Sequence, residues 1–168
     1  MEKYEVYKIL LLVSFVETWY KRLLVAVDGS EHSYKALDHA VAIAEKFDSE
    51  LVLLTVIPTM IVPFFPDKSF DPIIHEEVYK YQDRMMNLYH NMLKDAEETI
   101  SSKHPNLNIQ TILREGRPST TIVDVAEKEG CDMIVMGSRG MGGITGWVLG
   151  STSHRVAASC KKPVMIIK

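Results

Sequence analysis

The sequence contains very little cysteine. Its 168 residues include only two, Cys131 and Cys160. Their spacing fits neither a disulfide framework nor a Cys-x-x-Cys zinc or redox motif. We therefore expect both to be buried thiols of a protein that works in a reducing cytoplasm.

The sequence also lacks a cluster of basic residues. Its 19 Lys and Arg and 22 Asp and Glu give a net charge of −3, and the isoelectric point is near 6.1. A nucleic-acid surface needs a basic patch, so we expect no nucleic-acid partner. The six histidines are scattered without the spacing of a metal site.

A third absence is that of a long apolar run. The strongly apolar stretch Ile9–Val13 lies between Glu5 and Glu17, which are too close together for the roughly 20 apolar residues of a membrane span. We therefore expect no membrane partner. Residues 1–20 form an extension of unknown role. An added edge strand, an arm that packs on a partner chain and a mis-assigned translation start all stay open.

What is present is the composition of one soluble globular domain. Hydrophobic residues make up 46% of the chain and charged residues 24%. The length suffices for one domain with a good core and is too short for two ordinary ones.

Five short apolar segments alternate with four segments of helical periodicity. Short apolar runs bounded by turns predict buried strands, and apolar residues at helical spacing predict helices. The first predicted helix begins after Ser30, and the other three cover about 73–103, 119–129 and 151–159. This alternation predicts an α/β fold with a doubly wound, five-stranded parallel sheet. The predicted strands are Arg22–Val27, Leu51–Ile57, Asn108–Leu113, Asp132–Met136 and Pro163–Lys168.

The connections between these elements also carry expectations. Pro58–Pro72 is rich in proline and predicts an irregular loop, and Glu115–Pro118 predicts a turn. Ser30 is the expected N-cap of the first helix, and Gly130 the stop of the third. The long second helix is expected to pack through Val78, Tyr81, Met85, Leu88, Met92 and Ala96.

A glycine-rich stretch with the spacing Gly137-x2-Gly140-x9-Gly150-Ser151 follows the fourth strand. Glycines let a backbone approach an anion closely, and the start of the next helix supplies N–H donors. No lysine follows Gly150, so this is no Walker loop, and the spacing is not that of a dinucleotide fingerprint. The stretch predicts a phosphate-binding loop. A flexible connection without a ligand is the alternative.

Two charged residues lie beside this loop in the predicted sheet. Asp28, at the end of the first strand, is able to accept ribose hydroxyls or share a divalent cation with phosphates, and it is equally able to cap the following helix. Arg139 is either a phosphate contact or a solvated surface residue.

Several motifs occurring in order resemble the universal stress protein family, over roughly 21–168. One motif alone is weak, whereas the ordered set is specific. The motifs are Leu24–Ser30, Glu115–Pro118, Asp132–Gly140, Gly150–Ser153 and Lys162–Ile167.

The resemblance implies one domain over 21–168 with an adenine nucleotide alpha hydrolase-like sheet of strand order 3-2-1-4-5 and helices on both faces. The glycine spacing resembles the ATP-binding branch of the family, which implies ATP with Mg²⁺ or Mn²⁺ and a homodimer joined through the last strand. Asp28 would be the metal ligand shared with the phosphates. The implied nucleotide-binding residues are Ala26, Val27, Asp28 and Val56 on the first two strands, Met136, Gly137, Arg139 and Gly140 around the ribose and phosphates, and Gly150, Ser151, Thr152 and Ser153 at the phosphate end.

The leading hypothesis is therefore an ATP-binding regulatory or stress-response module without a catalytic residue of its own. One alternative is a slow ATPase or an adenylate-transferring enzyme on the same fold. Another is a structural or chaperone-like dimer that binds no nucleotide. No downstream protein partner, process or stress is indicated.

Overall fold

The computed structural model describes residues 20–59, 72–141 and 149–168, except for the side chains of 72–75. The N-terminal extension, the middle of the proline-rich loop and the middle of the glycine-rich stretch lie outside the described residues. No helix in the described ranges is long and apolar enough to cross a membrane.

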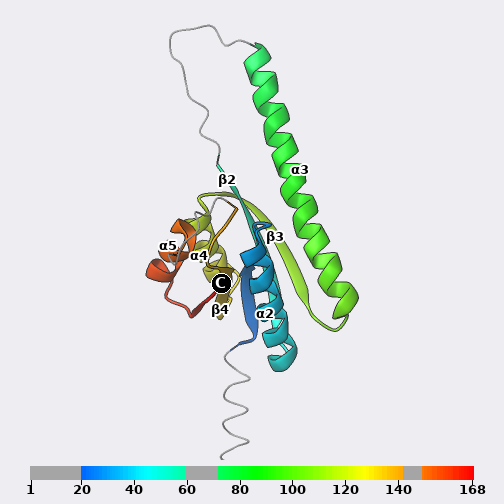
Figure 1. Ribbon diagram of the computed structural model, residues 1–168, viewed down its shortest axis with the longest axis vertical. Coiled ribbons are helices and arrows are strands. Elements are labelled where there is room, and N and C mark those ends of the chain that lie inside the picture. Colours follow the sequence, from blue (N-terminus) through cyan, green and yellow to red (C-terminus); the bar gives the residue numbers. More distant parts are fainter. Residues whose placement is uncertain (1–19, 60–71, 142–148) are drawn as a thin grey trace, which may run out of the picture.

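A five-stranded, fully parallel sheet forms the centre of the domain (Figure 1). The strands lie in the order β3-β2-β1-β4-β5, which confirms the predicted fold class and strand order. The strands are β1 Arg22–Ala26, β2 Glu50–Pro58, β3 Ile109–Gly116, β4 Met133–Gly137 and β5 Val164–Ile167, and the helices are α2 Glu31–Phe47, α3 Pro72–Lys103, α4 Pro118–Lys128 and α5 Ser151–Ser159.

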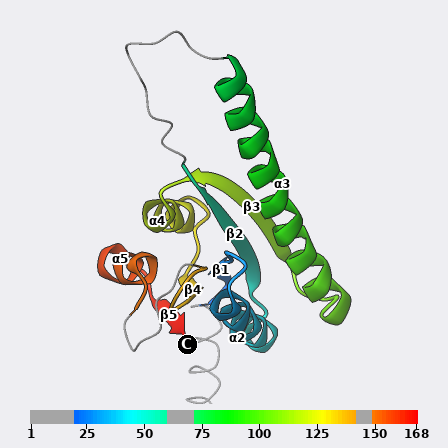
Figure 2. The same cartoon turned by 45° about the horizontal axis from the view of Figure 1, so that its top comes forward.

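Helices cover both faces of the sheet (Figure 2). Residues of β1 alternate between the two faces, so Leu23 and Val25 pack with α2 and α3, whereas Leu24 packs with α4 and α5. The chain leaves neighbouring strands β1 and β4 toward opposite faces, into α2 and α5 respectively. In such a sheet the ligand crevice lies at this switch point, beyond the carboxyl ends of the two strands.

The ends of two helices are as predicted. Ser30 is the N-cap of α2, and its hydroxyl accepts a hydrogen bond from the Ser33 N–H at 3.2 Å. Gly130 follows the last turn of α4, where the Cys131 N–H donates to the Ala126 carbonyl at 2.9 Å. Short polar side chains and glycine thus end these helices by satisfying groups that the helix leaves unpaired.

The predicted packing face of α3 was partly wrong. Tyr81 and Leu88 are 44% and 57% exposed, whereas Ala96 is buried as predicted and Met92 is partly buried. The other buried residues of this helix are Tyr89, Leu93 and Ile100. The cause is length: 32 residues span about 48 Å at 1.5 Å per residue. Only the C-terminal half lies over the sheet, and the N-terminal half projects beyond it (Figure 1).

The predicted turn over Glu115–Pro118 is shorter than expected. β3 continues through Gly116, which lies beside Pro58 of β2, and Pro118 already begins α4. Arg117 alone joins the two elements. Proline suits the first position of a helix because its missing N–H would have no partner there.

The two cysteines differ in environment. Cys131 is fully buried, and burial raises the pKa of its thiol to about 11. The expectation for Cys160 was only partly right, because this residue at the end of α5 is half-buried.

Thiol labelling of the native protein at pH 8 should therefore give one fast equivalent from Cys160 and a second only after unfolding, since the reactive form is the thiolate. Cys160→Ser should remove the fast phase, as monitored with Ellman's reagent. Rapid labelling of that variant under native conditions would contradict the burial of Cys131.

Candidate functional site

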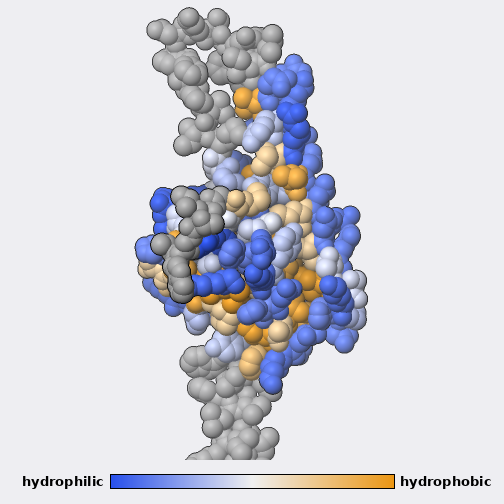
Figure 3. Space-filling model, viewed as in Figure 1, coloured by the Kyte–Doolittle hydropathy of each residue, from blue (hydrophilic) through white to orange (hydrophobic). Residues whose placement is uncertain are grey.

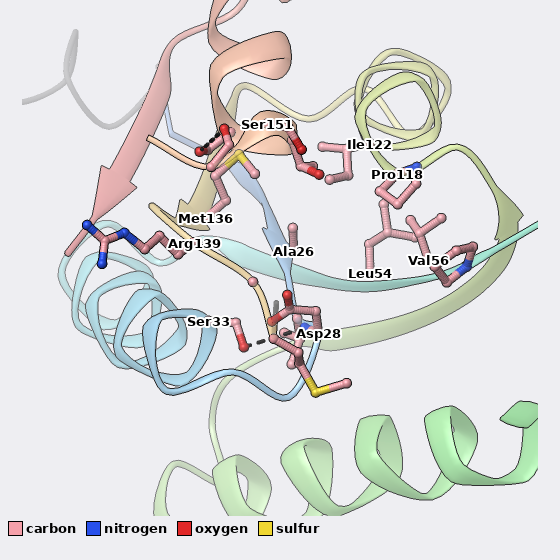
Figure 4. Close-up of a pocket in the computed structure, with 18 of the residues that line it drawn as sticks. Ala26, Asp28, Ser33, Leu54, Val56, Pro118, Ile122, Met136, Arg139 and Ser151 are labelled. Atoms are coloured by element: carbon pink, nitrogen blue, oxygen red, sulfur yellow. Dashed lines mark hydrogen bonds between the residues drawn. The ribbon is translucent and has the colours of Figure 1, made fainter. Parts of the chain in front are cut away.

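A cavity of about 540 Å³ lies at the carboxyl ends of β1, β2 and β4, between α4 and the start of α5 (Figure 4). Its volume is in the range of small-molecule sites. The structure brings together on its walls every residue expected from the sequence to contact a nucleotide: Ala26, Val27, Asp28, Val56, Met136, Gly137, Arg139, Gly140, Gly150, Ser151, Thr152 and Ser153.

Ser30 holds the side chain of Asp28 just beyond the carboxyl end of β1. Its Oδ1 accepts hydrogen bonds from the Ser30 N–H at 3.0 Å and from the Ser30 hydroxyl at 2.6 Å. Ser30, not Asp28, caps α2, so the helix-capping alternative for Asp28 is wrong. A Cβ on Gly140 would stand 2.4 Å from Asp28 Oδ2, so the glycine leaves the space that the carboxylate occupies.

The backbone of Ser138 joins three elements at the far side of the cavity. Its carbonyl accepts from the Gly150 N–H and from the Ser153 hydroxyl, each at 2.8 Å, and its N–H donates to the Ile167 carbonyl of β5. The Ser153 hydroxyl also lies 3.0 Å from the Gly150 carbonyl. This buried hydroxyl therefore holds the turn together rather than offering itself to a ligand.

The start of α5 offers backbone donors. Gly150 is its N-cap and makes no side-chain cap hydrogen bond. The first N–H groups of a helix have no partner within it, and the helix dipole favours an anion there. Gly150 has φ −63°, so the conformation does not demand glycine; a Cβ would instead approach the Ser138 carbonyl oxygen to 3.2 Å.

The opposite wall is apolar and comes from β2 and α4. Leu54 and Val56 lie beside Pro118 and Ile122 on one side of the cavity (Figure 4). The sequence motifs indicated only Val56 among these. Pro118 begins α4 directly after β3, which pairs with β2, so the expected strand order already offered a signal for the α4 contribution.

Tyr89 of α3 also lines the cavity, and no motif indicated it. It is 8% exposed. Burial raises the pKa of its hydroxyl, and the negative charge of Asp28 raises it further. The long helix α3 thus places a neutral phenol near Asp28, the single acidic side chain among the described residues that line the cavity.

Arg139 contributes mainly backbone to the cavity. Its carbonyl lies 3.2 Å from the Ser30 hydroxyl, which ties the loop after β4 to the start of α2. Its side chain extends away from Ala26 and Asp28 (Figure 4).

This fold and site have known relatives. The sequence matches the pattern of the universal stress protein family over residues 20–168. It is 33% identical to universal stress protein YxiE of Bacillus subtilis, over 89% of this chain and 99% of that protein. The chain belongs to the universal stress protein family.

Two solved structures extend the comparison. The structure of MJ0577, a universal stress protein of Methanocaldococcus jannaschii, matches with a TM-score of 0.66 at 29% identity, covering 89% of this chain and 96% of that one. A universal stress protein in complex with cAMP matches with a TM-score of 0.61 at 25% identity, covering 89% and 98%. Nucleotide binding therefore occurs among the relatives of this protein.

Gly137 is the residue of the site least able to accept a side chain. An added Cβ would lie 2.7 Å from the carbonyl carbon of His32, a backbone atom of α2 that cannot rotate away. Gly137→Ala should therefore lower the free energy of unfolding by about 1–3 kcal/mol, the range for overpacking. Gly150→Ala, where the nearest atom is 3.2 Å away, should cost less. Urea denaturation of both variants measures the order, and equal losses would contradict it.

Proposed function

We propose that this universal stress protein binds ATP in the cavity at the switch point and acts as a nucleotide-dependent regulatory or stress-response module in the cytoplasm. The observation that carries the proposal is the convergence of separate chain segments on one cavity, with glycine backbone and a helix start at one side and apolar side chains at the other. The relative in complex with cAMP supports an adenine nucleotide as ligand.

The two sides of the cavity match the two ends of a nucleotide. The base would lie against Leu54, Val56 and Ile122, where apolar side chains replace water. The phosphates would lie at the start of α5, where backbone N–H groups and the hydroxyls of Ser151 and Thr152 are available as donors. Gly140 leaves room for the Asp28 carboxylate beside this site, and Gly150 lets the start of α5 lie close to the Ser138 carbonyl.

A divalent cation would enter with the nucleotide. Among the described residues no three His, Cys, Asp or Glu side chains gather into a metal site. Mg²⁺ needs few protein ligands when phosphates and water complete its shell, and Mn²⁺ suits the same oxygen ligands. Asp28 would supply one carboxylate oxygen, since its Oδ1 already accepts two hydrogen bonds from Ser30.

We also propose a homodimer formed through β5. This strand is at one edge of the sheet, pairs with β4 on one side, and has four half-buried residues. An uncovered apolar edge favours pairing with another chain. Antiparallel pairing of two β5 strands about a two-fold axis would satisfy both edges.

The direct test is to identify nucleotide that co-purifies with the protein, by absorbance and mass spectrometry after denaturation. Bound ATP with negligible phosphate release supports the proposal. Steady phosphate release that is lost in Asp28→Ala would indicate the ATPase alternative. Absence of binding to added ATP would leave the structural dimer.

The backbone of the α5 start should matter more for ATP affinity than its hydroxyls. Gly150→Val adds a side chain against the Ser138 carbonyl and should weaken binding by at least about 100-fold, whereas Thr152→Val keeps its N–H and loses one neutral hydrogen bond, worth about tenfold at most. Calorimetric titration of both variants measures the difference. Wild-type affinity in Gly150→Val would place the phosphates elsewhere.

The dimer proposal predicts that Ile166→Lys gives a monomer, because it puts a charge in the middle of the proposed interface. Light scattering measures the mass. The matched control is Thr111→Lys, at an exposed residue of β3 on the other edge of the sheet, which should leave the dimer intact. A dimeric Ile166→Lys would exclude β5 as the interface.

A further inference from the structure

A second cavity, of about 530 Å³, lies between α3 and the ends of β2 and β3. We call it the α3 groove. Its apolar wall includes Tyr79, Met86 and Tyr89 of α3 and Ile57 and Pro58 of β2. It shares Tyr89 and Pro58 with the first cavity but extends along the part of α3 that projects beyond the sheet.

Some apolar residues of the α3 groove are unusually exposed, whereas Tyr89 and Ile57 at its base are buried. Tyr79 is 65% and Met86 43% exposed, although both lie on an amphipathic helix of a folded domain. In Figure 3, apolar residues appear on the upper part of α3 on the side turned toward β2, and its outer edge is polar. Exposed apolar surface of this kind, rimmed by polar groups, is typical of a binding site.

The length of the groove sets the number of residues that an extended occupant would need. Tyr79 and Tyr89 are ten residues apart on one helix, which corresponds to about 15 Å at 1.5 Å per residue. An extended peptide covers that length with about four or five residues at 3.3 Å each.

The acidic side chains of the groove favour an occupant with positive charge. Asp83 of α3 and Glu115 of β3 lie on its wall, and no Lys, Arg or His is among the described lining residues. Asp83 Oδ2 accepts from the Asn87 amide at 3.2 Å, which fixes one of its oxygens. The nearby Lys80 is paired with Glu76 at 2.7 Å and with Glu77 at 3.6 Å. A basic group is therefore the complement of this surface.

We propose that the α3 groove docks an extended segment of a partner protein in which apolar residues alternate with lysine or arginine. The apolar side chains pack on Met86, Tyr89 and Ile57, and the basic side chains reach Asp83 and Glu115. This assignment does not depend on a nucleotide in the first cavity.

The test uses two fluorescein-labelled synthetic pentapeptides, one alternating leucine with lysine and one alternating leucine with glutamate. Fluorescence anisotropy at moderate salt measures their binding to the full chain. The lysine peptide should bind at least about tenfold more tightly than the glutamate peptide, because its charges complement the groove. Equal affinity of the two peptides, or binding of neither at millimolar protein, would overturn the proposal.

Paired variants locate the binding. Asp83→Asn combined with Glu115→Gln removes both groove charges without a change of shape and should weaken binding of the lysine peptide by roughly fivefold or more. The control, Asp124→Asn with Glu127→Gln on α4, removes the same charge from exposed positions elsewhere and should change it less than about twofold. Equal loss in the two double variants would show a general charge effect and overturn the docking site.

A third variant tests the apolar contact. Met86→Ala, at a residue 43% exposed, should leave the circular dichroism melting curve near that of the wild type and weaken both peptides by roughly threefold or more. Unchanged binding would contradict packing in the α3 groove.

Discussion

The site depends on one buried peptide carbonyl, that of Ser138. Two donors on the far side of the glycine-rich stretch, the Gly150 N–H and the Ser153 hydroxyl, meet it at 2.8 Å. Leaving a buried acceptor without its partner costs about 1–3 kcal/mol, so this pair of hydrogen bonds keeps the start of α5 beside the end of β4. Because the N–H of the same residue donates to Ile167, the edge strand is tied to the same point.

The other walls of the cavity are formed by loops that lie close together because they leave the carboxyl ends of neighbouring parallel strands. The loops after β1 and β4 meet through the Ser30 hydroxyl, which lies between Asp28 and the Arg139 carbonyl. The two loops can approach this closely because Gly140 has no side chain, whose Cβ would strike the Asp28 carboxylate. Hydrogen bonds thus already hold the backbone on these walls of the cavity. The protein would therefore lose little conformational freedom when a ligand binds.

The sheet and the cavity were largely predictable, because buried strands are marked by continuous apolar runs and glycine spacing is local. The features that the sequence did not predict depend on how the elements pack in three dimensions. The face of α3 was misjudged because periodicity does not tell which turns have a sheet beneath them, and Leu88 therefore proved exposed. Tyr89 is far from every motif in the sequence and reaches the cavity only through packing. Neither the exposure of Cys160 nor the φ of Gly150 was deducible from neighbouring residues.

The length of α3 divides one continuous helix into two regimes. Leu93, Ala96 and Ile100 are part of the core, so we expect the amide hydrogens of those turns to exchange with solvent only when the sheet itself opens. From Glu76 to Leu88 no residue is buried, and ion pairs such as Lys80 with Glu76 add only about 0.2–0.5 kcal/mol. We therefore expect these outer turns to unwind at a lower free-energy cost than the turns over the sheet, without unfolding of the domain.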